Sequence, residues 1–140
     1  MPLSNELCHA YKAILREELL VAMGCTEPIA IAYAASILRK SLGTRPEAVR
    51  AKLSGNIIKN VKSVIVPATG GLHGIEAAVA AGIVANAPEK ELEVLTALEP
   101  RDRDAIAAFL DTCRITFNKI KLFYCKTVAL SPSGIHSVEH

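Results

Sequence analysis

Apolar and polar positions recur with helical spacing near the start of the chain. Over residues 5–23 one side of the predicted helix is charged, with Lys12, Arg16 and Glu17, and the opposite side is apolar. The apolar side comprises Leu7, Tyr11, Ile14, Ala22 and Met23. This pattern predicts an amphipathic helix, and Gly24 is expected to end it because glycine commonly follows a last helical turn.

A second helix is predicted from Pro28 to about Leu42. Residues 29–38 are apolar or small, and the charged side chains Arg39 and Lys40 come only in the last turn. A helix with so little polar surface is expected to be the central, buried helix of the fold. Gly43 follows it and is expected to terminate it.

The pattern becomes strand-like after residues 44–46. Residues 48–53 alternate between apolar and polar, which predicts a half-buried strand. Residues 57–60 favour a single helical turn, and the mostly β-branched residues 61–66 favour a second strand or an extended segment. A glycine-rich loop over residues 68–74 then leads into an alanine-rich helix over residues 75–84.

The last third of the chain mixes both patterns. Residues 92–98 fit helix or strand, and their alternation favours strand. Residues 101–113 predict a helix, because Pro100 precedes them and two aspartates occupy the first turn. Residues 115–129 predict one exposed edge strand, residues 131–134 a turn, and the tail from Ile135 is too short to add an element.

Together these elements predict an α+β fold. We expect a helix-rich single domain over residues 1–140, with a small sheet built from the segments near residues 48, 63, 93 and 120. The length of 140 residues suits one compact core and is too short for two.

Composition excludes several classes of protein. The hydrophobic fraction of 51% rules out disorder, and a scattered net charge of +2 does not indicate a nucleic-acid surface. The first residues do not resemble a signal peptide, and the longest apolar run is about half of what a membrane helix needs. We therefore expect a soluble, cytoplasmic protein without a membrane segment.

The four cysteines stand at positions 8, 25, 113 and 125. No two of them are close in sequence, so their spacing fits neither a disulfide framework nor a zinc site. An iron–sulfur site built from this chain alone lacks a recognisable ligand spacing as well.

The segment from Gly24 to Pro28 places a thiol directly before a helix. Proline suits the first helical position, which makes Thr26 or Glu27 the capping residue and leaves Cys25 facing free backbone N–H groups. The helix dipole would then lower the pKa of the Cys25 thiol and favour a nucleophilic or metal-binding thiolate. The alternative is that Cys25 is a small buried hydrophobe at a tight turn.

Two further loops carry polar groups that suit a small ligand. The first offers Ser54, Asn56, Lys59 and Asn60, whose hydroxyl, amide and ammonium groups could grip a carboxylate or an amino group. Its alternative is an ordinary polar turn, which is the more common case. The second loop places Thr69, Gly70 and Gly71 before a helix, where a small carboxylate fits better than a nucleotide, or where the chain simply packs tightly.

At these three loops the sequence resembles the L-cysteine desulfidase family, which is related to the alpha portion of the iron–sulfur L-serine dehydratases. The matching motifs are residues 24–28 (GCTEP), residues 54–60 (SGNIIKN) and, more loosely, residues 67–70 (PATG, where the family usually has PGTG). The resemblance covers the chain to about Phe123. It corresponds to the N-terminal part of the family only.

The resemblance implies an enzyme that splits L-cysteine into pyruvate, ammonia and sulfide with an iron–sulfur cluster as Lewis acid. Cys25 would take part in proton transfer with Glu27 beside it. The substrate's carboxylate and ammonium would be held by residues of the three motifs, namely Thr26, Ser54, Asn56, Lys59, Asn60, Thr69 and Gly70. Because cysteine and serine present the same two groups, the residues do not decide between them.

The family's cluster ligands lie in a later, mostly helical part that this sequence does not contain. Cys113 and Cys125 do not match the ligand motifs, so no cluster is expected on this chain alone. We therefore expect a truncated chain that is completed by a second polypeptide carrying the ligands. The alternative is a catalytically inactive remnant that acts as a binding or oligomerisation module, including a homo-oligomer.

Overall fold

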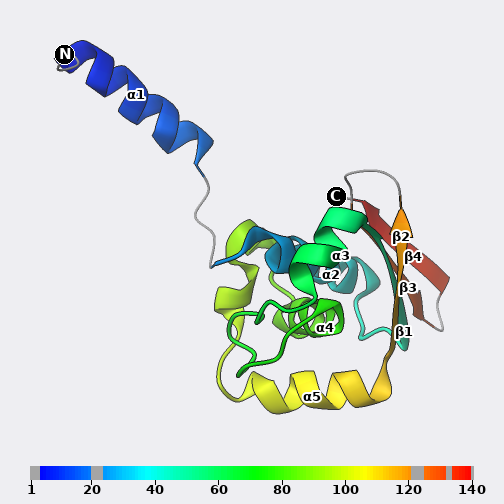
Figure 1. Cartoon of the computed structure of the whole chain (residues 1–140). Coiled ribbons are helices and arrows are strands. Elements are labelled where there is room, and N and C mark those ends of the chain that lie inside the picture. Colours follow the sequence, from blue (N-terminus) through cyan, green and yellow to red (C-terminus); the bar gives the residue numbers. More distant parts are fainter. Residues whose placement is uncertain (1–3, 20–23, 121–124, 132–133, 140) are drawn as a thin grey trace.

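The structure, a computed structural model, describes residues 4–19, 24–120, 125–131 and 134–139. Its helices and a four-stranded sheet form two layers, with the helices of the main body on one side of the sheet (Figure 1). The α+β, helix-rich class is therefore confirmed.

The first helix, α1 (Asn5–Glu18), stands apart from the other elements (Figure 1). The Ser4 hydroxyl caps it by accepting a hydrogen bond from the Leu7 N–H at 3.3 Å, and none of its residues is buried. Leu19, and not Gly24, is its C-cap. The predicted helix is therefore too long within the described chain, and residues 20–23 lie outside the described residues.

The core is built around α2 (Thr26–Leu42) and α4 (Ile75–Ala85). Both helices are predicted by the sequence, and α2 is the buried central helix, with Ile29, Ile31 and Leu38 fully buried. Gly43 ends α2 in the left-handed conformation at φ 74°, as expected. Small side chains let the two helices approach closely, which suits a core that is poor in aromatic residues.

The sheet has the strand order β2-β1-β3-β4. Its strands are β1 (Ala48–Ser54), β2 (Arg114–Ile120), β3 (Cys125–Ser131) and β4 (Gly134–Glu139). β1 pairs parallel with β2 and antiparallel with β3, and β3 pairs antiparallel with β4. Alternate residues of β1, namely Val49, Ala51 and Leu53, are buried, so the predicted half-buried strand is confirmed.

Two of the four predicted sheet segments are wrong. Residues 61–66 form no strand, because Val61 ends the helix α3 (Gly55–Val61) and Ile65 makes only an isolated bridge to His73. Residues 92–98 belong largely to the 3-10 helical segment η1 (Pro88–Ala97). Within η1 the adjacent residues Val94 and Leu95 are both fully buried. In a strand with one covered face, adjacent side chains point to opposite faces, so only one of the two would be buried.

The C-terminal third differs from the prediction in its strands. α5 (Asp102–Thr112) is confirmed, but the single strand predicted over residues 115–129 is divided into β2 and β3. β2 lies at a sheet edge as expected, whereas β3 is an interior strand. Residues 134–139 form β4, so the tail does add an element, and the predicted turn falls partly on residues 132–133, outside the described residues.

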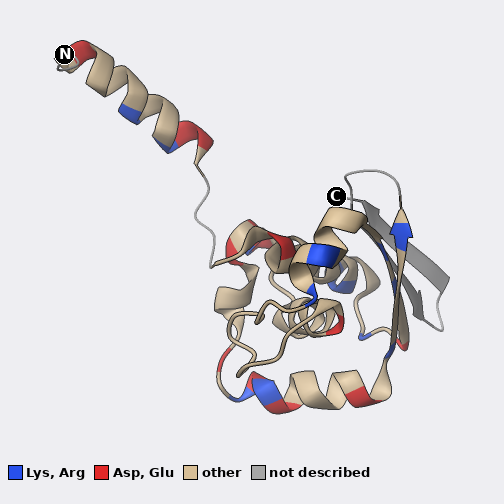
Figure 2. Cartoon of the chain, viewed as in Figure 1, with Lys and Arg blue, Asp and Glu red and all other residues tan. Residues whose placement is uncertain are grey.

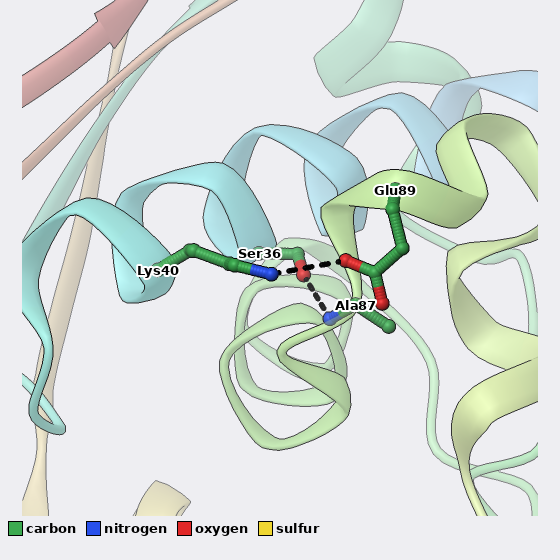
Figure 3. Close-up of polar contacts among 4 residues, drawn as sticks. All are labelled: Ser36, Lys40, Ala87 and Glu89. Atoms are coloured by element: carbon green, nitrogen blue, oxygen red, sulfur yellow. Dashed lines mark hydrogen bonds and ion pairs between the residues drawn. The ribbon is translucent and has the colours of Figure 1, made fainter.

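Polar contacts join the start of η1 to α2 (Figure 3). The buried Ser36 hydroxyl accepts a hydrogen bond from the Ala87 N–H at 2.8 Å, and Lys40 forms an exposed ion pair with Glu89 at 3.3 Å. Among the helices that the structure describes, none has the length and apolar character needed to span a membrane.

Candidate functional site

The first and second motifs meet at the side chain of Glu27. One carboxylate oxygen of Glu27 accepts a hydrogen bond from the Cys25 thiol, with Sγ to Oε2 at 2.9 Å. The other accepts a hydrogen bond from the Asn60 amide, with Nδ2 to Oε1 at 3.0 Å. Cys25 and Asn60 are exposed, so the three polar side chains form an open cluster between the start of α2 and the end of α3. We call it the thiol–carboxylate cluster.

The protonation of this cluster differs from the prediction. The hydrogen bond to Glu27 is the main cause that raises the pKa of the Cys25 thiol above its ordinary value of 9.0. The same bond is the main cause that lowers the pKa of the Glu27 carboxyl below 4.5, with help from backbone and Asn60 hydrogen bonds. The carboxylate therefore carries the charge and the thiol keeps its proton, so the expected thiolate is a wrong prediction.

The start of α2 also differs from the prediction in which residue caps the helix. Cys25 is itself the N-cap of α2 and makes no side-chain capping bond, so the prediction that Thr26 or Glu27 caps the helix is wrong. Thr26 is the first helical residue and is exposed. Pro28 sits inside the first turn, where a missing N–H has no intrahelical acceptor to lose. The alternative of a buried Cys25 is also wrong, because the residue is exposed.

The second motif divides into structural and accessible residues. Ser54 is buried, and its hydroxyl caps α3 by accepting a hydrogen bond from the Ile57 N–H at 3.4 Å. Asn56 and Lys59 are exposed, and neither side chain has a polar partner among the described residues. Asn56 and Lys59 thus remain available for a ligand on α3, whereas Asn60 contacts Glu27 and Ser54 caps the helix backbone.

The third motif lies beside the first, but Thr69 faces inward. The buried Thr69 hydroxyl donates to the Val66 carbonyl at 2.7 Å and accepts from the Leu72 N–H at 3.1 Å, which holds the loop together. A Cβ atom at Gly24 would lie 3.6 Å from Cγ of Pro67, so the two loops are neighbours. Thr69 therefore shapes the loop and is not presented to a ligand.

Two basic residues that the sequence prediction missed cover motif glycines. A Cβ atom at Gly70 (φ 79°) would lie 3.0 Å from Cδ of Arg103, and one at Gly55 would lie 2.8 Å from Cε of Lys119. Arg103 belongs to α5 and Lys119 to β2, far along the chain from the loops that they cover. No local signal could have found them, because only the tertiary fold brings them there.

The described residues do not assemble a metal site. Within residues 4–19 and 24–120, Cys8, Cys25 and Cys113 are free thiols on separate elements. No group of three or more His, Cys, Asp or Glu side chains that could hold a metal ion occurs among the described residues. The described side chains therefore do not fit an iron–sulfur cluster.

The sequence is similar to proteins named UPF0597. It is 55% identical over 100 residues to one from Desulfitobacterium hafniense, a match covering 71% of this chain and 23% of that protein. It is 54% identical over 95 residues to one from Treponema denticola (68% and 22%), and 36% identical over 138 residues to one from Vibrio parahaemolyticus (96% and 32%).

The chain is thus homologous to UPF0597 proteins over part of their length, and it spans about a quarter to a third of these relatives. The name UPF0597 states no activity. No family model matches the chain. No solved structure matches it either.

Proposed function

We propose that this chain is the N-terminal portion of an iron–sulfur-dependent lyase that degrades L-cysteine to pyruvate, ammonia and sulfide. The observation that carries the proposal is the contact of the Glu27 carboxylate with both the Cys25 thiol and the Asn60 amide. These side chains belong to the two motifs that resemble the L-cysteine desulfidase family. Homology to proteins several times longer supports the proposal that this chain acts together with a further part of the protein.

The cluster offers a proton acceptor and a proton donor side by side. In a β-elimination, the Glu27 carboxylate would accept the α-proton, and the electron pair of the Cα–H bond would form the Cα–Cβ double bond. The Cβ–S pair would leave with sulfur, to which the Cys25 thiol would donate a proton. The released 2-aminoacrylate takes up one water and yields pyruvate and ammonia.

Exposed polar groups stand on α3, the helix whose Asn60 contacts Glu27. Lys59 and Asn56 have no partner among the described residues, so an ammonium and an amide remain to bind the carboxylate of a small amino acid. Asn60 orients Glu27 through the bond at 3.0 Å. In this proposal Ser54 and Thr69 support the loops, which changes their expected role from binding to positioning.

The iron–sulfur cluster of the L-cysteine desulfidase family would act as a Lewis acid on the substrate. Since the described side chains do not fit such a group, we assign its ligands to a second polypeptide and derive no step through it. Cys8, Cys25 and Cys113 are free thiols, which suits the reducing cytoplasm where we propose that the reaction occurs.

The test is anaerobic reconstitution of this chain with a polypeptide that carries the rest of a UPF0597 sequence, supplied with iron and sulfide. We expect sulfide and pyruvate to form from L-cysteine in equal amounts. Cys25→Ser and Glu27→Gln should each lower the rate by about 100-fold or more, as loss of a proton-transfer group does. Cys8→Ser, a matched change of a cysteine on α1, should leave the rate unchanged.

The proposal fails if the complemented wild-type protein releases no sulfide, or if Cys25→Ser is as active as the wild type. Substituting L-serine for L-cysteine in the same assay decides which amino acid is preferred. If L-serine is converted to pyruvate while L-cysteine releases no sulfide, the activity is that of a dehydratase and not of a carbon–sulfur lyase.

A second candidate function is a binding or oligomerisation module without catalysis. The observation that favours it is α1, whose side chains Leu7, Tyr11, Ile14 and Leu15 are 40% to 55% exposed. An apolar helix face of this kind suits association with another protein surface or a second copy. Analytical ultracentrifugation of the wild type and of Ile14→Lys tests it, because an oligomer held by α1 should dissociate in the variant.

A further inference from the structure

A cavity of about 420 Å³ opens where the end of α5 meets the starts of β1 and β2. Its lining consists of Glu47, Ala48, Asp111, Thr112, Cys113 and Arg114. The cavity lies at the amino-terminal end of β1, whereas the thiol–carboxylate cluster adjoins α3, which follows the carboxyl end of β1. β1 is a strand of seven residues, about 20 Å long, and runs from the cavity to the start of α3; the cavity and the cluster share no residue, so they are different sites.

Charges of both signs line this cavity without neutralising one another. Glu47 and Asp111 contribute carboxylates and Arg114 contributes a guanidinium, and Figure 2 shows charged positions of both signs where α5 adjoins the sheet. All three residues are exposed, and none of their side chains forms a hydrogen bond or an ion pair with another described residue. Opposite charges that share a cavity without pairing are free to bind a ligand that carries both signs.

The backbone around the cavity is fixed. The Arg114 N–H donates to the Glu47 carbonyl at 3.1 Å, and the Cys113 N–H donates to the Phe109 carbonyl at 2.8 Å. The Thr112 hydroxyl donates back to the Ala108 carbonyl at 2.9 Å. The charged side chains therefore project from hydrogen-bonded backbone, which needs little ordering when a ligand binds.

The two sides of the cavity differ in the charge that they favour. The C-terminal end of α5 bears the negative end of the helix dipole, and Asp111 in its last turn adds a carboxylate, so this side favours a cation. Arg114 stands at the start of β2 and favours a carboxylate, which guanidinium groups can bind through two hydrogen bonds. The buried thiol of Cys113 adds an uncharged lining.

We infer that this cavity is a second, separate site that binds the zwitterion of a small α-amino acid. The ammonium group lies between Glu47 and Asp111, and the carboxylate lies against Arg114. The volume of about 420 Å³ leaves room for a short side chain beside the two charged groups. This inference does not depend on the proposed lyase activity, because it uses none of the residues of the thiol–carboxylate cluster.

The experiment is a titration of the full 140-residue chain with glycine, the smallest such zwitterion, followed by the backbone amide signals in NMR. The amides of residues 111–114 and 47–48 are expected to shift and to saturate together. Arg114→Gln and Asp111→Asn should each weaken glycine binding at least about tenfold, since each removes a charge-assisted hydrogen bond. Arg16→Gln on α1 is the matched control and should bind glycine like the wild type.

Two half-ligands test the need for both charges. Acetate lacks the ammonium and methylammonium lacks the carboxylate, so each should bind at least about tenfold more weakly than glycine. The inference is overturned if acetate binds as tightly as glycine, or if Arg114→Gln, shown to be folded by its amide spectrum, binds like the wild type. Shifts confined to residues 25–27 and 56–60 would also overturn it, and would instead support the site proposed for the lyase.

Discussion

Gly82 of α4 packs directly against the backbone of Ala32 in α2, so that a Cβ atom added at position 82 would overlap the Ala32 carbonyl. Backbone cannot move aside as the end of a flexible side chain can. The two helices that form the core are therefore held at a separation that only glycine permits at this crossing.

Gly82→Ala is expected to destabilise the protein by about 1–3 kcal/mol or more, as overpacking of a tight core does. Urea unfolding followed by circular dichroism measures the change. Gly55→Ala is the matched control, because Gly55 is also helical and its Cβ atom would meet only the flexible end of Lys119. A Gly82→Ala protein as stable as the control would show that the helices separate easily.

Ser36 and Lys40 both connect α2 to the start of η1, but their contributions should differ. Ser36→Ala leaves the buried Ala87 N–H without its acceptor and should cost about 1–3 kcal/mol. Lys40→Ala removes an exposed ion pair and should cost about 0–1 kcal/mol. Unfolding free energies of the two variants, measured together, test this order, and equal losses would contradict it.

The rate at which iodoacetamide alkylates Cys25 should depend on pH with a midpoint above 9.0, because the hydrogen bond to Glu27 favours the protonated thiol. Glu27→Gln should lower this midpoint by removing the negative charge. Mass spectrometry of the peptide that contains Cys25 follows the reaction separately from the other cysteines. A wild-type midpoint below 9.0 would show that the helix dipole, and not Glu27, governs the thiol.

The contact between Cys25 and Glu27 also makes the free energy of unfolding depend on pH, and the two pKa shifts give the direction. The raised pKa of Cys25 contributes stability that is present below pH 9.0 and lost as the pH rises past the folded value. The lowered pKa of Glu27 contributes stability that is present above pH 4.5 and lost as the pH falls. Both groups are near the surface, so the effect is small, and Glu27→Gln should flatten the acidic side of the stability curve.

Thr69→Val should destabilise the 67–74 loop by about 1–3 kcal/mol, because the Val66 carbonyl and the Leu72 N–H both lose their partner. Thr69→Ser keeps the hydroxyl and should retain most of the stability. Amide hydrogen exchange at Leu72 reports the loop directly. Unchanged exchange in Thr69→Val would contradict the structural role that we assign to this residue.

The helices could be predicted because their signals are local. An apolar run bounded by Pro28 and Gly43 identifies α2, and Pro100 with the acidic first turn identifies α5. The sheet could not be predicted in the same way, because a strand is defined by its partners, and β1 finds them only in the last third of the chain. Residues 92–98 show the limit, since their alternation fits a strand until Val94 and Leu95 are both found buried.

The structure brings three of the candidate site residues into contact, and their protonation differs from the prediction. Cys25 and Glu27 come from the first motif and Asn60 from the second, but helix position alone suggested a thiolate at residue 25. The protonation of Cys25 depends on the rotamer of Glu27, which brings its carboxylate to 2.9 Å from the thiol. Burial separates the remaining residues, because Ser54 and Thr69 face inward while Asn56 and Lys59 stay accessible.

The position of β1 in the middle of the sheet also sets the order of folding events. As the ribosome releases the chain, α2, β1 and α4 emerge long before the strands that flank β1. The helix pair can dock at once, but the two hydrogen-bonding edges of β1 have no neighbouring strand until residues 114–131 have been made. Non-local pairing of this kind slows folding, and the waiting strand is a natural target for chaperones during synthesis.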